Sequence, residues 1–375
     1  MTADLTSAPN VAAVQQPVEL AWYGCDLRSG RIVEELRALS TGGQPLSRKL
    51  GTSTTASTTL ALDGAPRDWE AATEPGRTML VAVDTLTDIP IGAWLTLTRA
   101  GGTAPELALG GVSPEGYFDR RYAAPYSGVG VDQAAILTGT GAPLMVTAPP
   151  FVFDAPPTGR AQTYSVTDGD DRTILSVWQE VTAGGGAEWT VDVAWLPDRS
   201  GFSLPVRIRP TIGRVTDSPE PHFDMPGCIT SYTLTETYED SKGTTRIRAY
   251  GDGEGDSRLR SELLTATDLI AAGWCLWEHR YTPADGLTDP VQLTRHARED
   301  LALMRTGATV WTVEAVASRA PRLGRDWGLG DSVRVDVARS PRHPRGATTT
   351  ARCWSWQLDP AADTVSPILV EEETG

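Results

Sequence analysis

The sequence predicts a mainly β protein with α+β inserts, built around two small β-barrel domains. Three observations lead to this class. Gly (37) and Pro (27) punctuate the 375 residues at short intervals. Short runs of alternating apolar and polar residues, typical of half-buried strands, recur in both halves of the chain. Helical signals are concentrated in two regions, at about 113–203 and 252–308.

The first element is an N-terminal arm, residues 1–17. It has no basic start and no long apolar run, so it does not resemble a signal peptide. A chain of this length exceeds one ordinary core, and two to four domains of roughly 100–150 residues are expected.

Residues 18–112 are predicted to form the first β-barrel domain. The runs "VELAWYGCDL", "RIVEEL", "TTLAL", "TMLVAVDT" and "AWLTLTRA" read as strands. Turn residues at Gly42-Gly43 and Pro75-Gly76 separate some of them.

An α+β insert domain is predicted for residues 113–203, and its start is marked by helix signals. Ser113 suits an N-cap, Pro114 the first helical position, and Glu115 the first turn. A short helix here would place Phe118 and Tyr122 on one face.

Two more helices and a strand are expected in this insert. One short helix lies near residues 131–137. A clearer helix follows Asp170 or Asp171, either of which can cap it, and an alternating strand, "AEWTVDVAWL", comes next. The stripe of the clearer helix is Ile174, Leu175, Trp178 and Val181.

The second β-barrel domain is predicted from residues 204–251 and 309–370, with a helix-containing insert at 252–308 and a C-terminal tail at 371–375. The insert holds the strongest helical pattern, with Asp289 as cap and Pro290 at the first position. Its stripe is Leu293, Ala297, Leu301 and Met304. The layout is duplicated, but no sequence repeat accompanies it.

The net charge of −15 and a pI near 4.8 argue against a protein that grips nucleic acid or anionic membranes. No apolar run approaches 18 residues, so no membrane insertion by this chain is expected.

Neither a metal site nor a cofactor is expected. The four histidines form no HExxH motif, and the four cysteines, which contain no CxxC pair, are read as buried free thiols. A loop from Asp252 spaces its acids as an EF-hand does. However, Ser257 replaces the required Gly and Leu263 the required Glu.

Catalytic motifs are also lacking, and the chain is not expected to be an enzyme. No GxSxG elbow or phosphate-binding glycine loop appears in context. Two carboxylate clusters could support glycoside hydrolysis, but short helix caps account for both and are the favoured interpretation. The clusters are Glu115 with Asp119, and Asp168 with Asp170 and Asp171.

The chain has twelve tryptophans, a number that suggests sugar binding. Many lie in alternating strands, which favours a role in the core or at a subunit interface. These are Trp22, Trp94, Trp189, Trp195, Trp311, Trp354 and Trp356.

The stretch from Phe118 to Tyr122 is the candidate site, as an inter-domain packing or hinge element. Asp119 stands beside Arg120 and Arg121, so inter-domain ion pairs are favoured over an anion site. Phe118 and Tyr122 would supply the packing.

Several of these segments together resemble minor tail proteins of long-tailed phages that infect actinobacteria. The segments are "CDLRSGRIVEEL", "LSRKLG", the run from Trp69 to Pro90, "EGYFDRRY", "EWTVDVAW" and "TATDLIAAGW". The match extends from about residue 18 to 370, and its order and spacing are more specific than any single motif. The same proteins are similar to the central hub protein of phage baseplates.

This resemblance implies a structural protein of the virion tail tip. Such a hub is a homotrimer, whose six barrels form a pseudo-sixfold ring between the sixfold distal tail ring and a threefold spike or fibre. The implied partners are the distal tail protein ring, other minor tail proteins, the tape measure protein and, transiently and without specificity, the DNA in the channel.

An acidic channel wall would let DNA pass without sticking. Two other functions remain open. One is a carbohydrate-binding or carbohydrate-cleaving tail protein, which would need an exposed Trp patch beside a carboxylate pair. The other is a cellular injection-system hub with the same fold.

Overall fold

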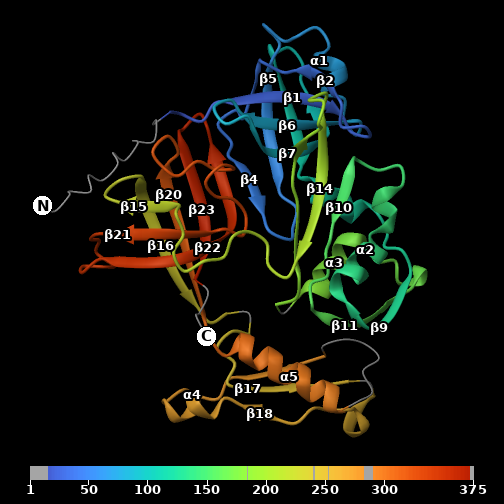
Figure 1. The fold of residues 1–375 in the computed structure, drawn as a ribbon, viewed down its shortest axis with the longest axis vertical. Helices are drawn as coiled ribbons and strands as arrows, with labels where there is room; N and C mark the ends of the chain where they lie inside the picture. Colours follow the sequence, from blue (N-terminus) through green and yellow to red (C-terminus); the bar gives the residue numbers. More distant parts are fainter. Residues whose placement is uncertain (1–15, 184, 240, 252, 283–289, 372–375) are drawn as a thin grey trace, which may run out of the picture.

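The computed structural model describes residues 16–183, 185–239, 241–251, 253–282 and 290–371. Figure 1 shows a mainly β chain, as the sequence predicts, with two large sheets and two inserts; the two barrels stay a prediction. Most of the predicted arm and of the C-terminal tail lie outside the described residues. No helix in the described part is long and apolar enough to cross a membrane.

The first sheet has seven antiparallel strands in the order β2-β1-β6-β7-β8-β5-β3. A short helix, α1 (Trp69–Ala72), lies between β5 and β6 in the chain. The strands are β1 (Leu20–Asp26), β2 (Ile32–Glu35), β3 (Leu39–Ser40), β5 (Thr55–Ala61), β6 (Thr78–Asp84), β7 (Ile89–Ala100) and β8 (Glu106–Val112).

Strand β6 shows which cores cover the two faces of this sheet. All seven of its residues are buried, because both of its faces are covered. Leu80 and Ala82 join a core shared with the second sheet, whereas Met79, Val81 and Val83 join the core of the first insert. The first sheet therefore contributes one face to each of these two cores.

The second sheet runs β15-β21-β22-β23-β20-β16. Strand β4 joins it through β22, although β4 lies within the range predicted for the first barrel. The strands are β4 (Leu46–Lys49), β15 (His222–Met225), β16 (Ile229–Thr237), β20 (Ala308–Val316), β21 (Ser332–Val337), β22 (Ala347–Asp359) and β23 (Thr364–Val370).

The first insert contains a small sheet, a separate two-stranded antiparallel sheet (β9 and β11), two α-helices and three short 3₁₀ helices. Strand β14 pairs with β10, β12 and β13, so it belongs with the insert and not with the second sheet, where the sequence analysis placed most of its residues. The elements are η1 (Pro114–Arg120), β9 (Tyr126–Asp132), α2 (Gln133–Thr140), η2 (Ala142–Met145), β10 (Phe151–Asp154), β11 (Ala161–Val166), η3 (Asp168–Asp170), α3 (Ile174–Thr182), β12 (Glu188–Val191), β13 (Ala194–Trp195) and β14 (Phe202–Arg209).

The first helix of this insert begins at Pro114 after Ser113, as predicted, but other helix boundaries differ from the prediction. The first helix, η1, is a 3₁₀ helix in which Phe118 is buried while Tyr122, beyond its end, is 64% exposed. The cap of α3 is Thr173, whose hydroxyl accepts the Ser176 N–H. Asp170 instead ends η3, where its carboxylate accepts the N–H of the N-cap residue Thr167. The sequence did not reveal this separate turn. The predicted stripe of α3 is buried.

The second insert is a three-stranded sheet, β18-β17-β19, covered by α5. Strand β17 was predicted to lie in the second barrel, but it pairs only with strands of this insert among the described residues. The elements are β17 (Arg246–Ala249), η4 (Gly255–Ser257), β18 (Leu264–Thr265), α4 (Thr267–Ala271), β19 (Glu278–Tyr281) and α5 (Pro290–Met304).

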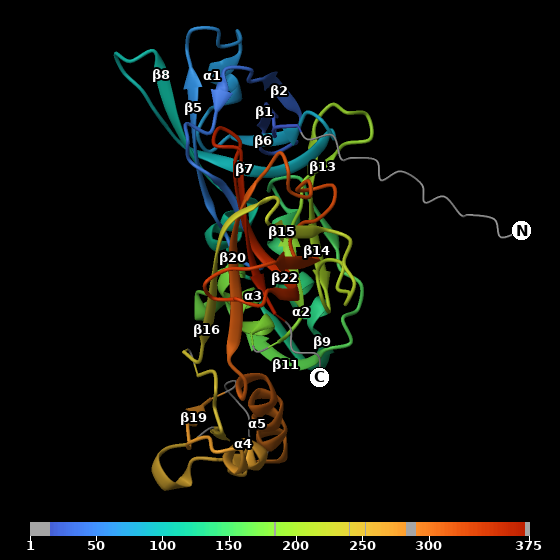
Figure 2. The same ribbon diagram turned by 90° about the vertical axis from the view of Figure 1, so that its left-hand side faces the viewer.

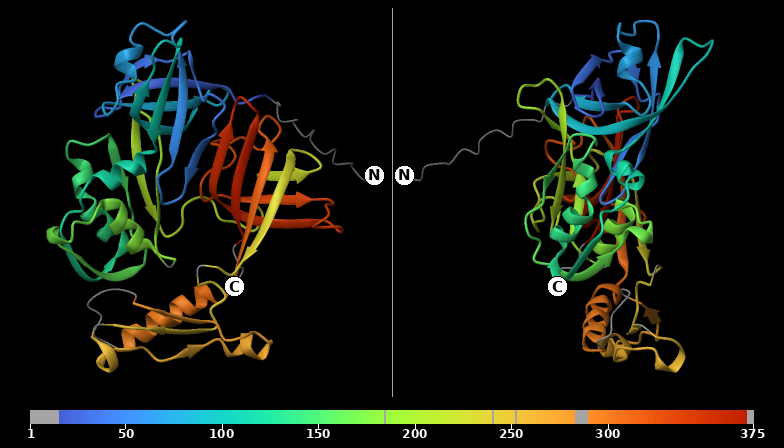
Figure 3. Two further views of the ribbon diagram at one scale, coloured as in Figure 1. Left: turned by 180° about the vertical axis from the view of Figure 1, so that it is seen from behind. Right: turned by 90° about the vertical axis from the view of Figure 1, so that its right-hand side faces the viewer.

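The stripe predicted for α5 is confirmed. Leu293 and Ala297 are fully buried on β17, and Leu301 and Met304 pack beside them. The predicted cap Asp289 lies outside the described residues. Figures 2 and 3 show this insert at one end of the molecule, below the end of β16 and the start of β20.

Five of the seven strand tryptophans are buried, which confirms a core role for them. Trp195 is half-buried, and Trp354 is 37% exposed. The five buried residues are Trp22, Trp94, Trp189, Trp311 and Trp356.

Candidate functional site: a charged junction between the two sheets and the first insert

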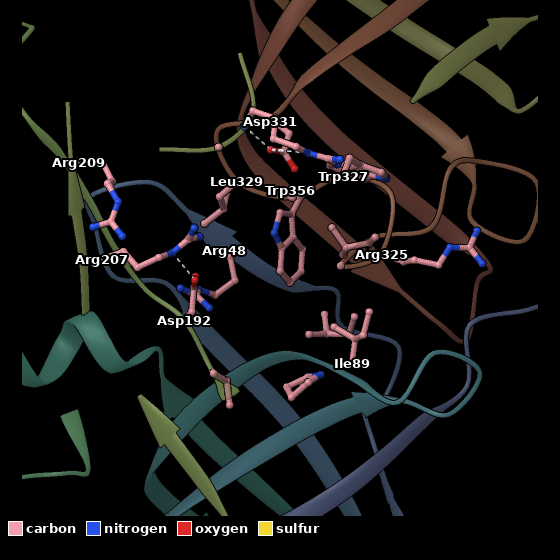
Figure 4. Close-up of a pocket in the computed structure, with 18 of the residues that line it drawn as sticks. Arg48, Ile89, Asp192, Arg207, Arg209, Arg325, Trp327, Leu329, Asp331 and Trp356 are labelled. Carbon is pink, nitrogen blue, oxygen red and sulfur yellow. Dashed lines mark hydrogen bonds and ion pairs between the residues drawn. The ribbon is translucent and has the colours of Figure 1, made fainter. Parts of the chain in front are cut away.

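The first sheet, the second sheet and the first insert meet around a cavity of about 580 Å³ (Figure 4). Segments far apart in the sequence line it. They include Arg48 on β4, Asp192 and Arg207 in the first insert, and Trp327 and Asp331 before β21. We call this region the junction.

The most deeply buried ion pair of the junction joins Arg48 to Glu115. The Arg48 Nη2 atom lies 2.8 Å from Glu115 Oε1, and both side chains are at most 5% exposed. Arg48 also donates to the Val191 carbonyl at 2.6 Å, and the Val191 N–H donates to Glu115 at 3.2 Å. Strand β4 is thereby fixed to η1 and β12 of the first insert.

A second buried pair joins the two sheets. Arg322, in the chain after β20, donates two hydrogen bonds to Asp84 at the end of β6, at 2.7 and 2.6 Å. It also donates to the carbonyl oxygens of Gln16 and Pro17. Burial opposes ionisation of Asp84, but the bonds from Arg322, Leu86 and Thr87 outweigh it and lower its pKa.

A third pair joins the second sheet to the first insert. Arg352 on β22 binds Glu188 on β12 through its two terminal guanidinium nitrogens, Nη1 and Nη2, with Nη1 2.6 Å from Oε1. Its remaining donors reach the carbonyl oxygens of Gly330 and Ile212, at 2.8 and 2.6 Å. The Ile212 N–H in turn donates to Glu188.

Each of these pairs spans two units of the fold. A buried pair adds little net stability, but removing one partner leaves an unpaired buried charge that costs about 3–5 kcal/mol. The pairs therefore fix one relative orientation of the three units, because any other arrangement would separate the charges.

The other arginines that line the cavity also have carboxylate partners. Arg214 contacts Asp331 at 3.7 Å, and the backbone N–H of Arg214 donates to the same carboxylate at 2.6 Å. The remaining pairs are Arg207–Asp192 (2.5 Å), Arg209–Asp154 (2.5 Å) and Arg325–Asp326 (2.8 Å). The cavity wall is thus a network of paired charges.

The residues predicted as an inter-domain hinge contact the first insert. Phe118 packs against Trp178 and Trp189, with ring centroids 5.1 and 5.6 Å apart. Asp119 accepts a hydrogen bond from Thr173. These contacts show packing within the insert, and a hinge role stays a prediction.

The arginines of this stretch do not form the expected contacts. Arg121 donates to the carbonyl oxygens of Pro143 and Val146 and lies over the Tyr117 ring, so its described partners are not carboxylates. Arg120 is exposed. The inter-domain charge lies three residues before this stretch, at Glu115, which the sequence analysis weighed only as a helix cap or a catalytic acid.

Some of the junction residues that the sequence analysis missed carry a detectable signal. Arg48, Asp84 and Arg352 each occupy a buried position of a strand, whereas Glu115 lies in η1 and Arg322 in the loop after β20. Arg48 follows Leu46 by two residues in β4, and Asp84 ends the apolar run of β6. A charge at such a position requires a buried partner.

Other candidate chemistry is not brought together. Glu115 is buried and paired, whereas Asp119 is exposed. The Asp170 carboxylate lies in η3, and the hydrogen bonds from Thr167 lower its pKa. In the described part of the chain, no three His, Cys, Asp or Glu side chains gather as a metal site would require.

Three cysteines are buried, as predicted, but Cys275 is exposed. Burial raises the pKa of Cys228 to about 11, and it raises the pKa of Cys25 and Cys353 further. Cys275 is therefore the accessible thiol among the described cysteines.

The fold is similar to that of solved phage tail proteins. No protein-family model matches the sequence, and no curated protein matches it. Solved structures match along nearly the whole chain, at 10–12% identity, a level that shows the fold alone.

Three of these structures are tail proteins from bacterial genomes. The tail protein from Neisseria meningitidis is 12% identical with a TM-score of 0.55, over 89% of this chain and 95% of that one. Prophage tail protein gp18 from Listeria monocytogenes is 11% identical with a TM-score of 0.55, over 95% of each chain. The prophage MuSo2 43 kDa tail protein from Shewanella oneidensis is 10% identical with a TM-score of 0.56, over 94% and 97%.

Proposed function

We propose that this chain is a structural tail-tip hub, a homotrimer that adapts the sixfold tail tube and distal tail ring to a threefold spike or fibre. The observation that carries the proposal is the likeness to phage tail proteins over almost the full length of both chains. In the proposed trimer, the two sheets of each copy act as the two barrels, and six of them form a pseudo-sixfold ring.

The junction gives this role a physical basis. A symmetry adaptor must hold its two ring-forming units at a fixed angle, because a change in that angle would open the ring. Arg322–Asp84 joins the two sheets directly, and Arg48–Glu115 and Arg352–Glu188 join the second sheet to the first insert. Bending at the junction would pull these partners apart and leave buried charges unpaired, so bending is opposed.

The proposed partners are the neighbouring copies, the distal tail ring, other minor tail proteins and the tape measure protein, in the virion tail tip. DNA would touch the channel wall only in passing. With a net charge of −15, a wall that shares the acidic character of the chain would repel phosphates. A strongly basic wall in the assembled ring would contradict this part of the proposal.

The alternative, a carbohydrate-binding or carbohydrate-cleaving tail protein, needs tryptophan faces beside free carboxylates. At the junction, Trp327 and Trp356 are at most 3% exposed, and Asp192 and Asp331 are paired with arginines. The structural role therefore accounts better for this cavity.

The experiment that tests the proposal is a cryo-EM reconstruction of the particle that carries this chain. Three copies in a pseudo-sixfold ring on the tail axis are expected. A peripheral position, with an open groove lined by tryptophans and carboxylates, would favour the carbohydrate alternative instead.

A further inference from the structure

The large apolar side chains that the described residues expose are unevenly distributed. Most lie on the two inserts, and few on the two sheets that make up the bulk of the fold. The exposed residues of the inserts are Tyr122, Val129, Met145, Val146, Val152, Tyr238, Leu263, Trp274, Leu276, Trp277 and Val291. Clustered exposed apolar surface of this kind marks interaction sites.

The second insert carries an aromatic patch, which we define as Tyr238, Trp274, Leu276 and Trp277. Their exposed fractions are 51%, 36%, 50% and 64%. The Tyr238 and Trp274 rings contact each other at 5.2 Å. The Trp277 backbone is fixed, because its N–H donates to Thr245 Oγ1 at 2.8 Å and its carbonyl accepts the Thr245 N–H at 3.0 Å.

The first insert carries an aliphatic patch, which we define as Tyr122, Met145 and Val146. Their exposed fractions are 64%, 55% and 62%. Arg121 holds them together, since it adjoins Tyr122 and donates to the carbonyl oxygens of Pro143 and Val146, at 2.8 and 3.4 Å. The patch is thus built on the stretch from Phe118 to Tyr122.

Two unlike patches on one chain are what a ring of identical copies requires. In a cyclic trimer, each interface is heterologous, so one surface of a copy meets a different surface of the next. The aromatic patch exposes on the order of 300–500 Å² if each large side chain offers about 150–250 Å² when bare. That is about half of the ~800 Å² that each partner of a stable interface buries. The patch is therefore large enough to form the centre of an interface.

We propose that the aromatic patch of one copy packs on the aliphatic patch of the next copy in the trimer. This inference rests on the proposed homotrimer. The ion pairs of Glu278 with Arg246 and Arg280, at 3.3 and 3.7 Å, would lie beside the contact as its polar rim.

Cys275 provides a probe within the aromatic patch, because it is exposed between Trp274 and Leu276. We would fuse a short trimeric coiled coil after residue 375, so that the copies meet at a high effective concentration. The rate of Cys275 labelling by a maleimide is then compared with that of the untagged monomer. Thr103→Cys at the exposed tip of the β7–β8 hairpin is the control site.

Labelling of Cys275 is expected to slow by about tenfold in the trimer, while position 103 is unchanged. The second measurement identifies the occupant. In Met145→Cys chains, a short bismaleimide is expected to join Cys275 of one copy to position 145 of the next, and to give covalent dimers and trimers on a denaturing gel. Trp277→Ser should abolish the crosslink, whereas Trp354→Ser, on the second sheet, should not.

The outcomes separate this inference from the proposed function. A threefold ring of folded chains in which Cys275 labels at the monomer rate would overturn the inference and leave the hub intact. Protection that appears only when another tail protein is added would assign the patch to that protein and would also overturn the inference. Tagged chains that stay independent, with position 145 uncrosslinked, would count against both.

Discussion

At the scale of single residues, the junction shows that buried charge fixes geometry more than it adds stability. Arg48, Arg322 and Arg352 each place a guanidinium at a boundary between units and pair it with a carboxylate and at least one backbone carbonyl oxygen. Such a site tolerates loss of a partner poorly, because the remaining charge has no access to water.

Replacing Arg48 by Met tests this directly. The change keeps most of the side-chain volume but strands Glu115, which is fully buried. The free energy of unfolding, measured by urea denaturation, is expected to fall by about 3–5 kcal/mol. Arg37→Met removes an exposed ion pair with Glu35 and should leave the free energy of unfolding nearly unchanged. Equal losses in the two variants would contradict the argument.

The lowered pKa of Asp84 predicts that the folded state becomes less stable in acid. Its folded pKa lies below the unfolded value of about 3.9, so its contribution is complete above that value and is lost as pH falls through the folded pKa. Melting curves between pH 6 and 2 should therefore show a steeper acid loss for the natural chain than for Asp84→Asn. Parallel curves would show that Asp84 does not contribute.

The raised pKa of Asp300 predicts the opposite dependence, a folded state that becomes less stable as pH rises. Burial raises the pKa of Asp300 to about 6, so the folded state holds its proton more tightly than the unfolded state. Stability should decline as pH rises from about 4 to 6 and then level off. Asp300→Asn should raise the melting temperature of the second insert at pH 7.5 but have little effect at pH 4. A gain of the same size at both pH values would exclude this cause.

At the scale of elements, local rules explain where helices begin. The Thr173 hydroxyl caps α3 and also donates to Asp119, so it ties the helix start to η1. Thr173→Ala should lower the free energy of unfolding by about 1 kcal/mol. Thr138→Ala in α2, whose hydroxyl binds only carbonyls of its own helix among the described residues, should cost less than half of that. The reverse order would argue against the capping contact.

Element by element, the sequence predicted the mainly β class, the core side of α3 and α5, and the burial of most strand tryptophans. It predicted poorly where pairing is non-local. Strands β4, β14 and β17 alternate like any half-buried strand, and alternation does not say which sheet receives them. The junction was hidden for the same reason, since Arg48 and Glu115 are 67 residues apart and only the fold brings them together.

At the scale of the whole molecule, the fold divides into a large body and a separate second insert. The two sheets and the first insert share extensive cores, whereas the second insert has its own small one around Leu293 and Ala297. Small separate cores open at lower free energy than the rest of a protein.

Hydrogen exchange should therefore divide the chain in two. Amides of β17 and α5 are expected to exchange well before those of β6 and β22, and Leu293→Ala should speed exchange in the second insert alone. Leu60→Ala, in the shared core, should instead speed exchange across both sheets. Uniform exchange throughout the chain would show that the insert is not an independent unit.

The placement of β4 has a consequence for the order in which the chain is made. Residues 46–49 pair with residues 355–358, about 300 positions later. At ~5–20 residues per second, a ribosome takes on the order of 15–60 s to supply that partner. Until then Arg48 has no second sheet beside it, and the N-terminal third of the chain cannot finish folding. Strand β22, which is synthesised late, is therefore needed to complete the pairing of the early strand β4. A fragment that stops before β22 leaves β4 without this partner.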